Sequence, residues 1–253
     1  MRRNFTAFSL LFGMQICFLS VSAQLINIES KRMEAAKEGW AGQGEFAYAF
    51  IKNQNTFSQM STRLNFIYNK KQNTYIILTD LSFIQSSAGD FENAGFQHVR
   101  YNYAKTNKLT YEAYSQVQYS KQMHLYPRYA IGAGPRCKIF KNDSVRVYAG
   151  ASLLFEHEQL QEPYAIMSNE RLTGYFSCII NKIPNVSVDF MMMFQPRLFD
   201  FNDVRFQSEL RLDFPVSSQL KFRFATSIYN DSKHPIGVPN NFTQARNSII
   251  YNF

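Results

Sequence analysis

The sequence predicts an all-β protein, a transmembrane antiparallel up-and-down β-barrel of about twelve strands that follows a cleaved signal peptide. Three observations lead to this prediction. An apolar segment opens the chain, apolar and polar residues alternate from residue 39 to the end, and many of the alternating stretches run 12–15 residues. Globular strands are typically about 5–6 residues long, whereas tilted strands need about 9–11 residues to cross the hydrocarbon of a bilayer.

Residues 1–23 have the pattern of a secretory signal peptide. Arg2 and Arg3 precede an apolar stretch over residues 7–19, and the small residues at 21–23 form a cleavage site. We expect cleavage between Ala23 and Gln24. Residues 24–38 then form a periplasmic N-terminal segment and residues 39–253 form the barrel. The alternative for residues 1–23 is a buried N-terminal helix.

Residues 204–214 show the alternation clearly. Val204, Phe206 and Leu210 share one parity, and Arg205 and Arg211 share the other. A period of two places the two sets on opposite faces of a sheet. In a membrane barrel the apolar face meets lipid and the polar face lines the interior. The alternative is a soluble exported ligand-binding barrel, in which the apolar face would point inward.

Turn-forming residues separate the predicted strands, which are 39–51, 55–69, 74–85, 93–105, 109–121, 127–141, 144–158, 168–181, 185–198, 202–215, 218–231 and 241–253. Even-numbered connections are short and most odd-numbered connections are longer, as in 86–92 and 159–167. Outer-membrane barrels have short periplasmic turns and longer outer loops, so an even strand count returns both termini to the periplasm. Pro135 cannot donate a ladder hydrogen bond, and we expect a bulge or a bend there.

The chain ends with three residues of matching parity, Ile249, Tyr251 and Phe253. A terminal phenylalanine that closes an alternating strand resembles the signal by which outer-membrane barrels of Gram-negative bacteria are recognised for assembly. We therefore expect the protein in the cell outer membrane. Its expected partners are the barrel-assembly machinery during biogenesis and the surrounding outer-membrane lipid and lipopolysaccharide.

Charged residues on the inward parity are the candidates for lining the lumen: Arg136, Arg146, Arg171, Arg205, Glu209, Arg211, Asp213, Lys221 and Arg223. Buried charges are tolerated only when they are paired or hydrated, so two interpretations stay open. The barrel is either a narrow passive channel for ions or small solutes, or an envelope-structural protein that a paired network fills and rigidifies. Arginine is in excess near the last strands, so a conducting lumen would favour anions.

No catalytic motif and no metal-ligand spacing is visible, so we expect no enzymatic activity, no metal and no cofactor. The four histidines, His98, His124, His157 and His234, form no such motif. In the run from Glu156 to Glu158, alternation sends His157 to the face opposite both acids. The alternative is an outer-membrane enzyme acting on lipid or lipopolysaccharide, which would need a serine, a histidine and an acid that converge at the outer rim.

Charge and cysteine content limit the remaining possibilities. The net charge is +8, but the basic residues form no long run, so we expect no nucleic-acid binding. Beyond the signal peptide only Cys137 and Cys178 remain, and we expect two unpaired, buried thiols. The sequence leaves the oligomeric state open.

Three segments resemble a family of uncharacterised outer-membrane β-barrel proteins. They are residues 38–46, the Gly-x-Gly-x-Arg strand at 129–136, and residues 147–158, where a glycine is followed by an aromatic residue and an acid. The family, a domain of unknown function, includes the salt-induced outer-membrane proteins of enteric bacteria and relatives in Bacteroidota. The resemblance implies an outer-membrane barrel of unassigned activity and supplies no catalytic residues. Pro135 departs from the family pattern.

Overall fold

The computed structural model describes residues 38–52, 56–86, 89–121, 123–161, 164–183 and 185–253. The predicted signal peptide, its cleavage site at Ala23 and Gln24, and nearly all of the predicted segment 24–38 lie outside the described residues. Within the described part of the chain, no helix is long and apolar enough to span a membrane.

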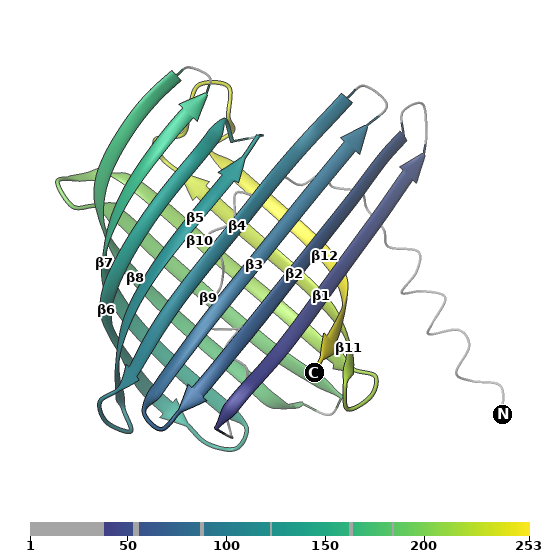
Figure 1. The fold of residues 1–253 in the computed structure, drawn as a ribbon, viewed down its shortest axis with the longest axis vertical. Coiled ribbons are helices and arrows are strands. Elements are labelled where there is room, and N and C mark those ends of the chain that lie inside the picture. Colours follow the sequence, from purple (N-terminus) through teal and green to yellow (C-terminus); the bar gives the residue numbers. More distant parts are fainter. Residues whose placement is uncertain (1–37, 53–55, 87–88, 122, 162–163, 184) are drawn as a thin grey trace.

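Twelve antiparallel strands form one closed barrel (Figure 1). They are β1 (Gly39–Lys52), β2 (Thr56–Lys70), β3 (Asn73–Ser86), β4 (Gly89–Ala104), β5 (Leu109–Ser120), β6 (Leu125–Lys141), β7 (Val145–Gln161), β8 (Tyr164–Ile183), β9 (Val186–Arg197), β10 (Asp200–Pro215), β11 (Leu220–Asp231) and β12 (Asn241–Asn252). Each strand pairs with its neighbours in sequence, and β1 pairs with β12. The predicted fold class is confirmed.

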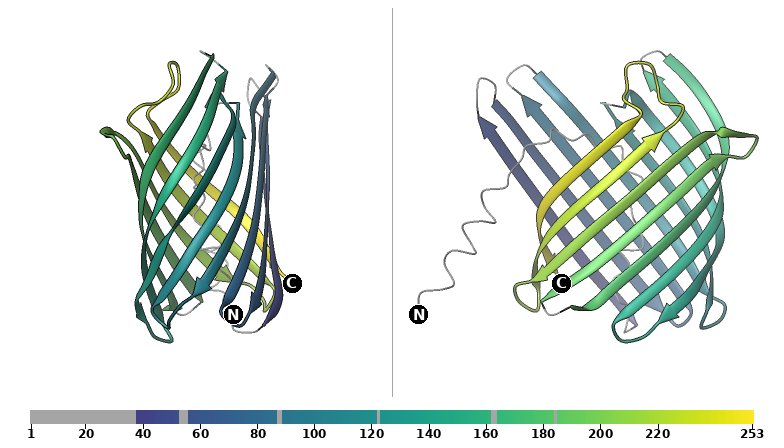
Figure 2. Two further views of the ribbon diagram at one scale, coloured as in Figure 1. Left: turned by 60° about the vertical axis from the view of Figure 1, so that its left-hand side comes forward. Right: turned by 180° about the vertical axis from the view of Figure 1, so that it is seen from behind.

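Closure of the barrel depends on the seam between β1 and β12. Its register contains four residue pairs, from Gln43 opposite Asn252 to Phe46 opposite Ile249. Backbone hydrogen bonds between Gly42 and Phe253 extend it, with N···O distances of 3.1 and 3.2 Å. β1 begins and β12 ends at the same end of the barrel (Figures 1 and 2). We call this the proximal end and the opposite one the distal end.

Polarity is inverted relative to a soluble protein. Arg171 and Arg211 are each 1% exposed, whereas Ile131 is 61% and Phe222 is 40% exposed. Burial alternates residue by residue in β12, where Arg246 and Ser248 are buried between exposed neighbours. Charged groups inside and apolar groups outside suit a barrel surrounded by lipid. This overturns the soluble alternative, in which the apolar face points inward.

A row of aromatic rings follows the proximal end of β1–β4 on the outer wall. Trp40, Tyr68, Tyr75 and Tyr101 stand on four successive strands, and successive ring centroids lie 4.9, 6.2 and 5.2 Å apart. Amphipathic rings favour the boundary between hydrocarbon and water. The row therefore marks the level at which the proximal membrane interface crosses these strands.

The predicted long connections are mostly wrong. β4 begins at Gly89 and β8 at Tyr164, so most of 86–92 and 159–167 belongs to strands. The ladder between β7 and β8 continues to the pair Gln161–Tyr164, because both strands keep their alternation of inward and outward residues to that point. Among the described connections, residues 232–240 between β11 and β12 form the only long one.

Pro135 inserts no bulge at its position in β6. It lies opposite Tyr111 of β5, and the β6–β7 register continues unshifted from Ala133 opposite Leu153 to Arg136 opposite Gly150. The pairs between these two are missing, which is the local cost of the absent N–H. The neighbouring Gly134 is required sterically, since a Cβ there would lie 1.9 Å from the backbone oxygen of Ala151.

Cys137 and Cys178 are free thiols, as expected. The expected burial is wrong, because Cys137 is exposed on the outer wall and Cys178 is only half-buried. Neither takes part in closing the barrel.

Candidate functional site: the charged interior of the barrel

The interior carries balanced charge. Among the residues that the structure describes, eight arginines and eight carboxylates are buried: Arg63, Arg100, Arg128, Arg171, Arg205, Arg211, Arg223 and Arg246, with Glu45, Asp80, Glu112, Glu156, Glu158, Asp203, Glu209 and Asp231. The arginine excess expected near the last strands is thus offset by carboxylates on those strands and on others. Ion pairs gather thirteen of these residues into three clusters, and Glu209 and Arg211 form a separate pair.

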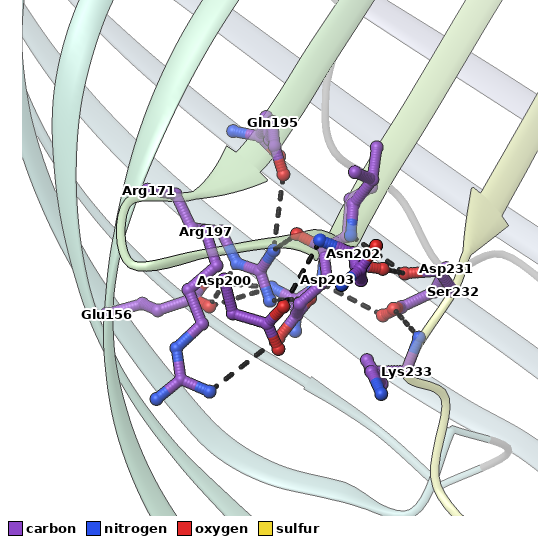
Figure 3. Close-up of polar contacts among 12 residues, drawn as sticks. Glu156, Arg171, Gln195, Arg197, Asp200, Asn202, Asp203, Asp231, Ser232 and Lys233 are labelled. Atoms are coloured by element: carbon purple, nitrogen blue, oxygen red, sulfur yellow. Dashed lines mark hydrogen bonds and ion pairs between the residues drawn. The ribbon is translucent and has the colours of Figure 1, made fainter.

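The first group, which we call the distal charge cluster, consists of Arg128, Glu156, Glu158, Arg171, Asp203, Arg205 and Asp231. Arg171 of β8 donates from Nε to Glu156 Oε1 at 2.7 Å and from Nη2 to Asp203 Oδ1 at 2.7 Å. Its Nη1 donates to the carbonyl oxygens of Gln195 and Asp203 (Figure 3). Every nitrogen of this guanidinium has an acceptor, so the side chain is fixed in one position.

Arg205 of β10 connects distant strands in the same cluster. It donates from Nη1 to Glu156 Oε2 at 2.8 Å, pairs through Nη2 with Glu158 Oε1 at 2.8 Å, and donates from Nε to Asp231 Oδ2 at 2.9 Å. Arg128 of β6 pairs with Glu156 and Glu158 from the other side, both at 3.2 Å. β6 and β11 are five strands apart in a ring of twelve, so this cluster bridges nearly opposite walls.

An apolar cluster accompanies this bridge at the distal end. Met123, Leu125 and Leu160, around β6 and β7, pack with Tyr229, Val238 and Phe242, around β11 and β12. Val238 belongs to the long connection 232–240 and is 3% exposed. The connection therefore folds inward and contacts the opposite wall. The Tyr229 hydroxyl donates to Asp231 at 3.1 Å and joins the apolar cluster to the distal charge cluster.

A second group, the seam cluster, spans the closure of the barrel. It comprises Glu45, Arg63, Asp80, Asp213, Arg223 and Ser248. Glu45 of β1 accepts from Arg63 of β2 at 3.4 Å, from Arg223 of β11 at 3.1 Å and from Ser248 of β12 at 2.7 Å. Arg63 also pairs with Asp80. Arg223 donates two hydrogen bonds to Asp213, from Nε at 2.6 Å and from Nη2 at 2.7 Å. These contacts join strands on both sides of the short β1–β12 ladder.

The third group surrounds Glu112 of β5. Arg100 of β4 donates to it at 2.7 Å, Arg136 of β6 lies 3.9 Å away, and the Tyr175 hydroxyl of β8 donates at 2.9 Å. A cavity of ≈ 30 Å³ lies beside these residues, about the volume of one water molecule. The wall here is thus lined by paired charges with room for bound water.

Seven of the nine predicted lumen residues take part in ion pairs: Arg136, Arg171, Arg205, Glu209, Arg211, Asp213 and Arg223. Arg146 and Lys221 are half-buried near the proximal ends of β7 and β11. A role for any of them in passing a solute stays a prediction.

The distal carboxylates were missed as site residues. Glu156, Glu158, Asp203 and Asp231 stand near the distal ends of their strands and are not among the predicted lumen residues. Their parity was the available signal, because each shares the inward face of its strand. As predicted, His157 points to the other side: its Nδ1 lies 3.0 Å from Ser168 Oγ on the outer wall.

The predicted assembly-signal residues line the outside of the seam. Ile249, Tyr251 and Phe253 are all exposed on the outer wall. The Phe253 ring lies over Gly42 of β1, where a Cβ would be 2.2 Å from the ring. Recognition of these residues during assembly stays a prediction. Among the described residues, no group of three or more His, Cys, Asp or Glu side chains is placed to hold a metal ion.

A family described as "Protein of unknown function, DUF481" matches residues 44–253. The chain belongs to the DUF481 family. No curated protein matches it. Among solved structures, this DUF481 protein is similar to the COG4313 outer membrane channel from Pseudomonas putida F1, with 10% identity over 87% of this chain and 97% of that chain and a TM-score of 0.53.

A second similar structure is the NanC porin, with 7% identity, 83% of this chain and 98% of that chain covered, and a TM-score of 0.52. At such identities the likeness concerns the fold. Together with the apolar outer wall and the closed ladder, it identifies the DUF481 protein as an outer-membrane β-barrel.

Proposed function

We propose that this protein is a narrow passive channel of the outer membrane for small solutes, with no enzymatic activity, and that the distal charge cluster forms its constriction. The observation that carries the proposal is the polar inner wall, which holds buried charges on most strands in equal numbers of each sign. A wall of this kind is compatible with water along the pore axis. The fold that it shares with a porin and an outer-membrane channel supports the same function.

The charge balance bears on selectivity. A pore with a large excess of one sign concentrates the oppositely charged solute. Here the charges of the buried arginines and carboxylates sum to zero, and most of these residues form ion pairs with one another. We therefore propose small neutral or zwitterionic solutes as the favoured cargo, with weak preference between anions and cations.

A second function, that of an envelope-structural barrel with a closed lumen, is favoured by a different observation. The ion pairs of Arg205 with Glu156 and Glu158 join β10 to β7 across the interior, and the Val238 contacts close over the same end. If these bridges never part, the same network serves only to stiffen the barrel.

Planar-bilayer conductance of the refolded protein separates the two functions. A double variant, Arg205→Gln with Glu156→Gln, removes a bridge across the lumen without changing net charge. We expect larger single-channel steps than for the unmodified protein. The matched control is Arg100→Gln with Glu112→Gln, which removes a pair between the adjacent strands β4 and β5 and should leave the step size near that of the unmodified protein.

Absence of conductance in both the unmodified protein and the bridge variant would refute the channel and leave the structural function. Heat-modifiable migration on gels confirms that each variant is folded. Swelling of liposomes in neutral solutes measures the proposed cargo class directly.

A further inference from the structure

The outer wall of β4–β8 carries a groove that the lumen does not explain. It has a volume of ≈ 600 Å³, within the roughly 300–1,000 Å³ range of ligand sites. Ten of its lining residues belong to the outward parity, two from each of the five strands, so it faces the membrane and not the interior. The strands concerned come forward in the left view of Figure 2.

The lining changes character along the groove. From β4 to β7 the exposed apolar side chains Val99, Val117, Ile131 and Phe155 form the walls, and the small Ser115 leaves the space between them. The four adjacent strands β4–β7 span about 14 Å at the usual spacing of about 4.8 Å. The apolar part is thus an extended slot, of a length that suits much of a single hydrocarbon chain.

The groove ends in polar groups on β7 and β8. His157 Nδ1 and Ser168 Oγ lie 3.0 Å apart, and Glu170, two residues along β8, is half-buried on the same face. These residues lie toward the distal ends of their strands. A carboxylate beside hydrogen-bonding groups favours a ligand that donates hydrogen bonds and carries positive charge.

We propose that this groove binds one membrane lipid, with an acyl chain in the apolar slot and an amine-bearing headgroup at His157, Ser168 and Glu170. The occupant is a lipid because the groove is continuous with the wall that already faces the bilayer. Lipid tails are as apolar as the slot, so hydrophobic transfer gives no preference there. The preference comes from van der Waals contact with a concave surface and from the headgroup bonds.

The slot is tested with a phosphatidylethanolamine that carries a photoreactive diazirine in its acyl chain. After illumination in lipid nanodiscs, we expect labelled peptides to concentrate in β4–β7. Ser115→Phe fills the slot and should abolish this preferential labelling. Ala113→Phe is the matched control, since Ala113 lies on the same strand and face but does not line the groove, and it should retain the labelling.

The headgroup is tested by native mass spectrometry with phosphatidylethanolamine and phosphatidylcholine of identical chains. Phosphatidylcholine has no N–H donor, so the unmodified protein should retain more phosphatidylethanolamine, and Glu170→Gln should lose this difference. Label spread evenly over all outward strands, equal labelling of the two phenylalanine variants, or equal retention of the two lipids would overturn the proposal. None of these outcomes depends on conductance, so the channel proposal is tested separately.

Discussion

Glu156 shows how a single carboxylate can be accommodated inside a barrel wall. Three arginines on three different strands, Arg128, Arg171 and Arg205, direct donors at its two oxygens. Desolvating a charge is expensive, and only close partners of opposite sign with good geometry offset the cost. The three arginines also need Glu156, because without it their own positive charges would face one another.

A first prediction at this scale concerns removal of that charge. Glu156→Gln should destabilise the barrel by about 3–5 kcal/mol, the cost of leaving buried charges without a partner. Denaturant unfolding in lipid vesicles measures the free energy. Asp143→Asn, at an exposed turn between β6 and β7, should change it by less than about 0.5 kcal/mol. Equal effects of the two substitutions would contradict the assigned role of Glu156.

A second residue-scale prediction concerns two glycines in strands. A Cβ at Gly134 would overlap the backbone of Ala151 and Ser152 at 1.9 and 2.5 Å, whereas nothing lies within 4 Å of a Cβ at Gly174. Gly134→Ala should therefore lower the free energy of unfolding by about 1–3 kcal/mol through overpacking. Gly174→Ala should cause no loss. The same vesicle unfolding assay compares them, and a neutral Gly134→Ala would show that β6 and β7 approach less closely.

Among the elements, the connection 232–240 is unusual because it packs into the barrel. Val238 is 3% exposed in the distal apolar cluster, whereas Ile236 in the same connection is 81% exposed. Val238 N donates to the Pro235 carbonyl at 3.1 Å, and Gly237 adopts a positive φ of 82°. This turn directs one side chain inward and leaves its apolar neighbour outside.

Release of this anchor should be visible by proteolysis. Burying a valine is worth about 1.5 kcal/mol, so Val238→Ser should raise tryptic cleavage after the exposed Lys233 roughly tenfold. Ile236→Ser, the matched control, should leave the rate unchanged. If both variants are cut at the rate of the unmodified protein, the connection is held by something other than Val238.

The strands themselves were predictable because a period of two is a local property. All twelve were located from alternation, including β6 in spite of Pro135, since one missing N–H interrupts the ladder without shifting its register. The long distal loops were predicted wrongly at β4 and β8, where turn-forming and polar residues continue as strand. Polar residues tolerate a strand position beyond the lipid, so composition does not mark the end of the ladder there.

The interior was predictable only in part, for a geometric reason. Parity states that Arg205 points inward, but not that it reaches Glu156 three strands away. That contact depends on strand tilt and on the height at which each residue stands, which only the closed barrel defines. The groove beside Ser115 was invisible in the sequence for the same reason, because its lining comes from five strands.

For the molecule as a whole, the closed even-stranded barrel and its asymmetry along the axis set an orientation. β1 begins and β12 ends at the proximal end, where the described connections are two to four residues long, and the one long connection among the described residues lies at the distal end. Barrels of this class place short turns in the periplasm. We therefore expect the distal charge cluster and the apolar cluster with Val238 on the outer side, together with the polar end of the proposed lipid groove.

The orientation gives the last prediction. Cysteines placed singly at Asn240 or Lys233, at the distal end, should react on intact cells with a maleimide that does not cross membranes. Cysteines at Lys108 or Asp143, at the proximal end, should react only after lysis. All four positions are exposed, so differences in labelling report the side of the membrane and not burial. The exposed Cys137 must first be replaced, together with Cys178, because it would add a background signal. Labelling of the proximal pair alone on intact cells would show that the barrel has the opposite orientation. The proposed constriction would then face the periplasm.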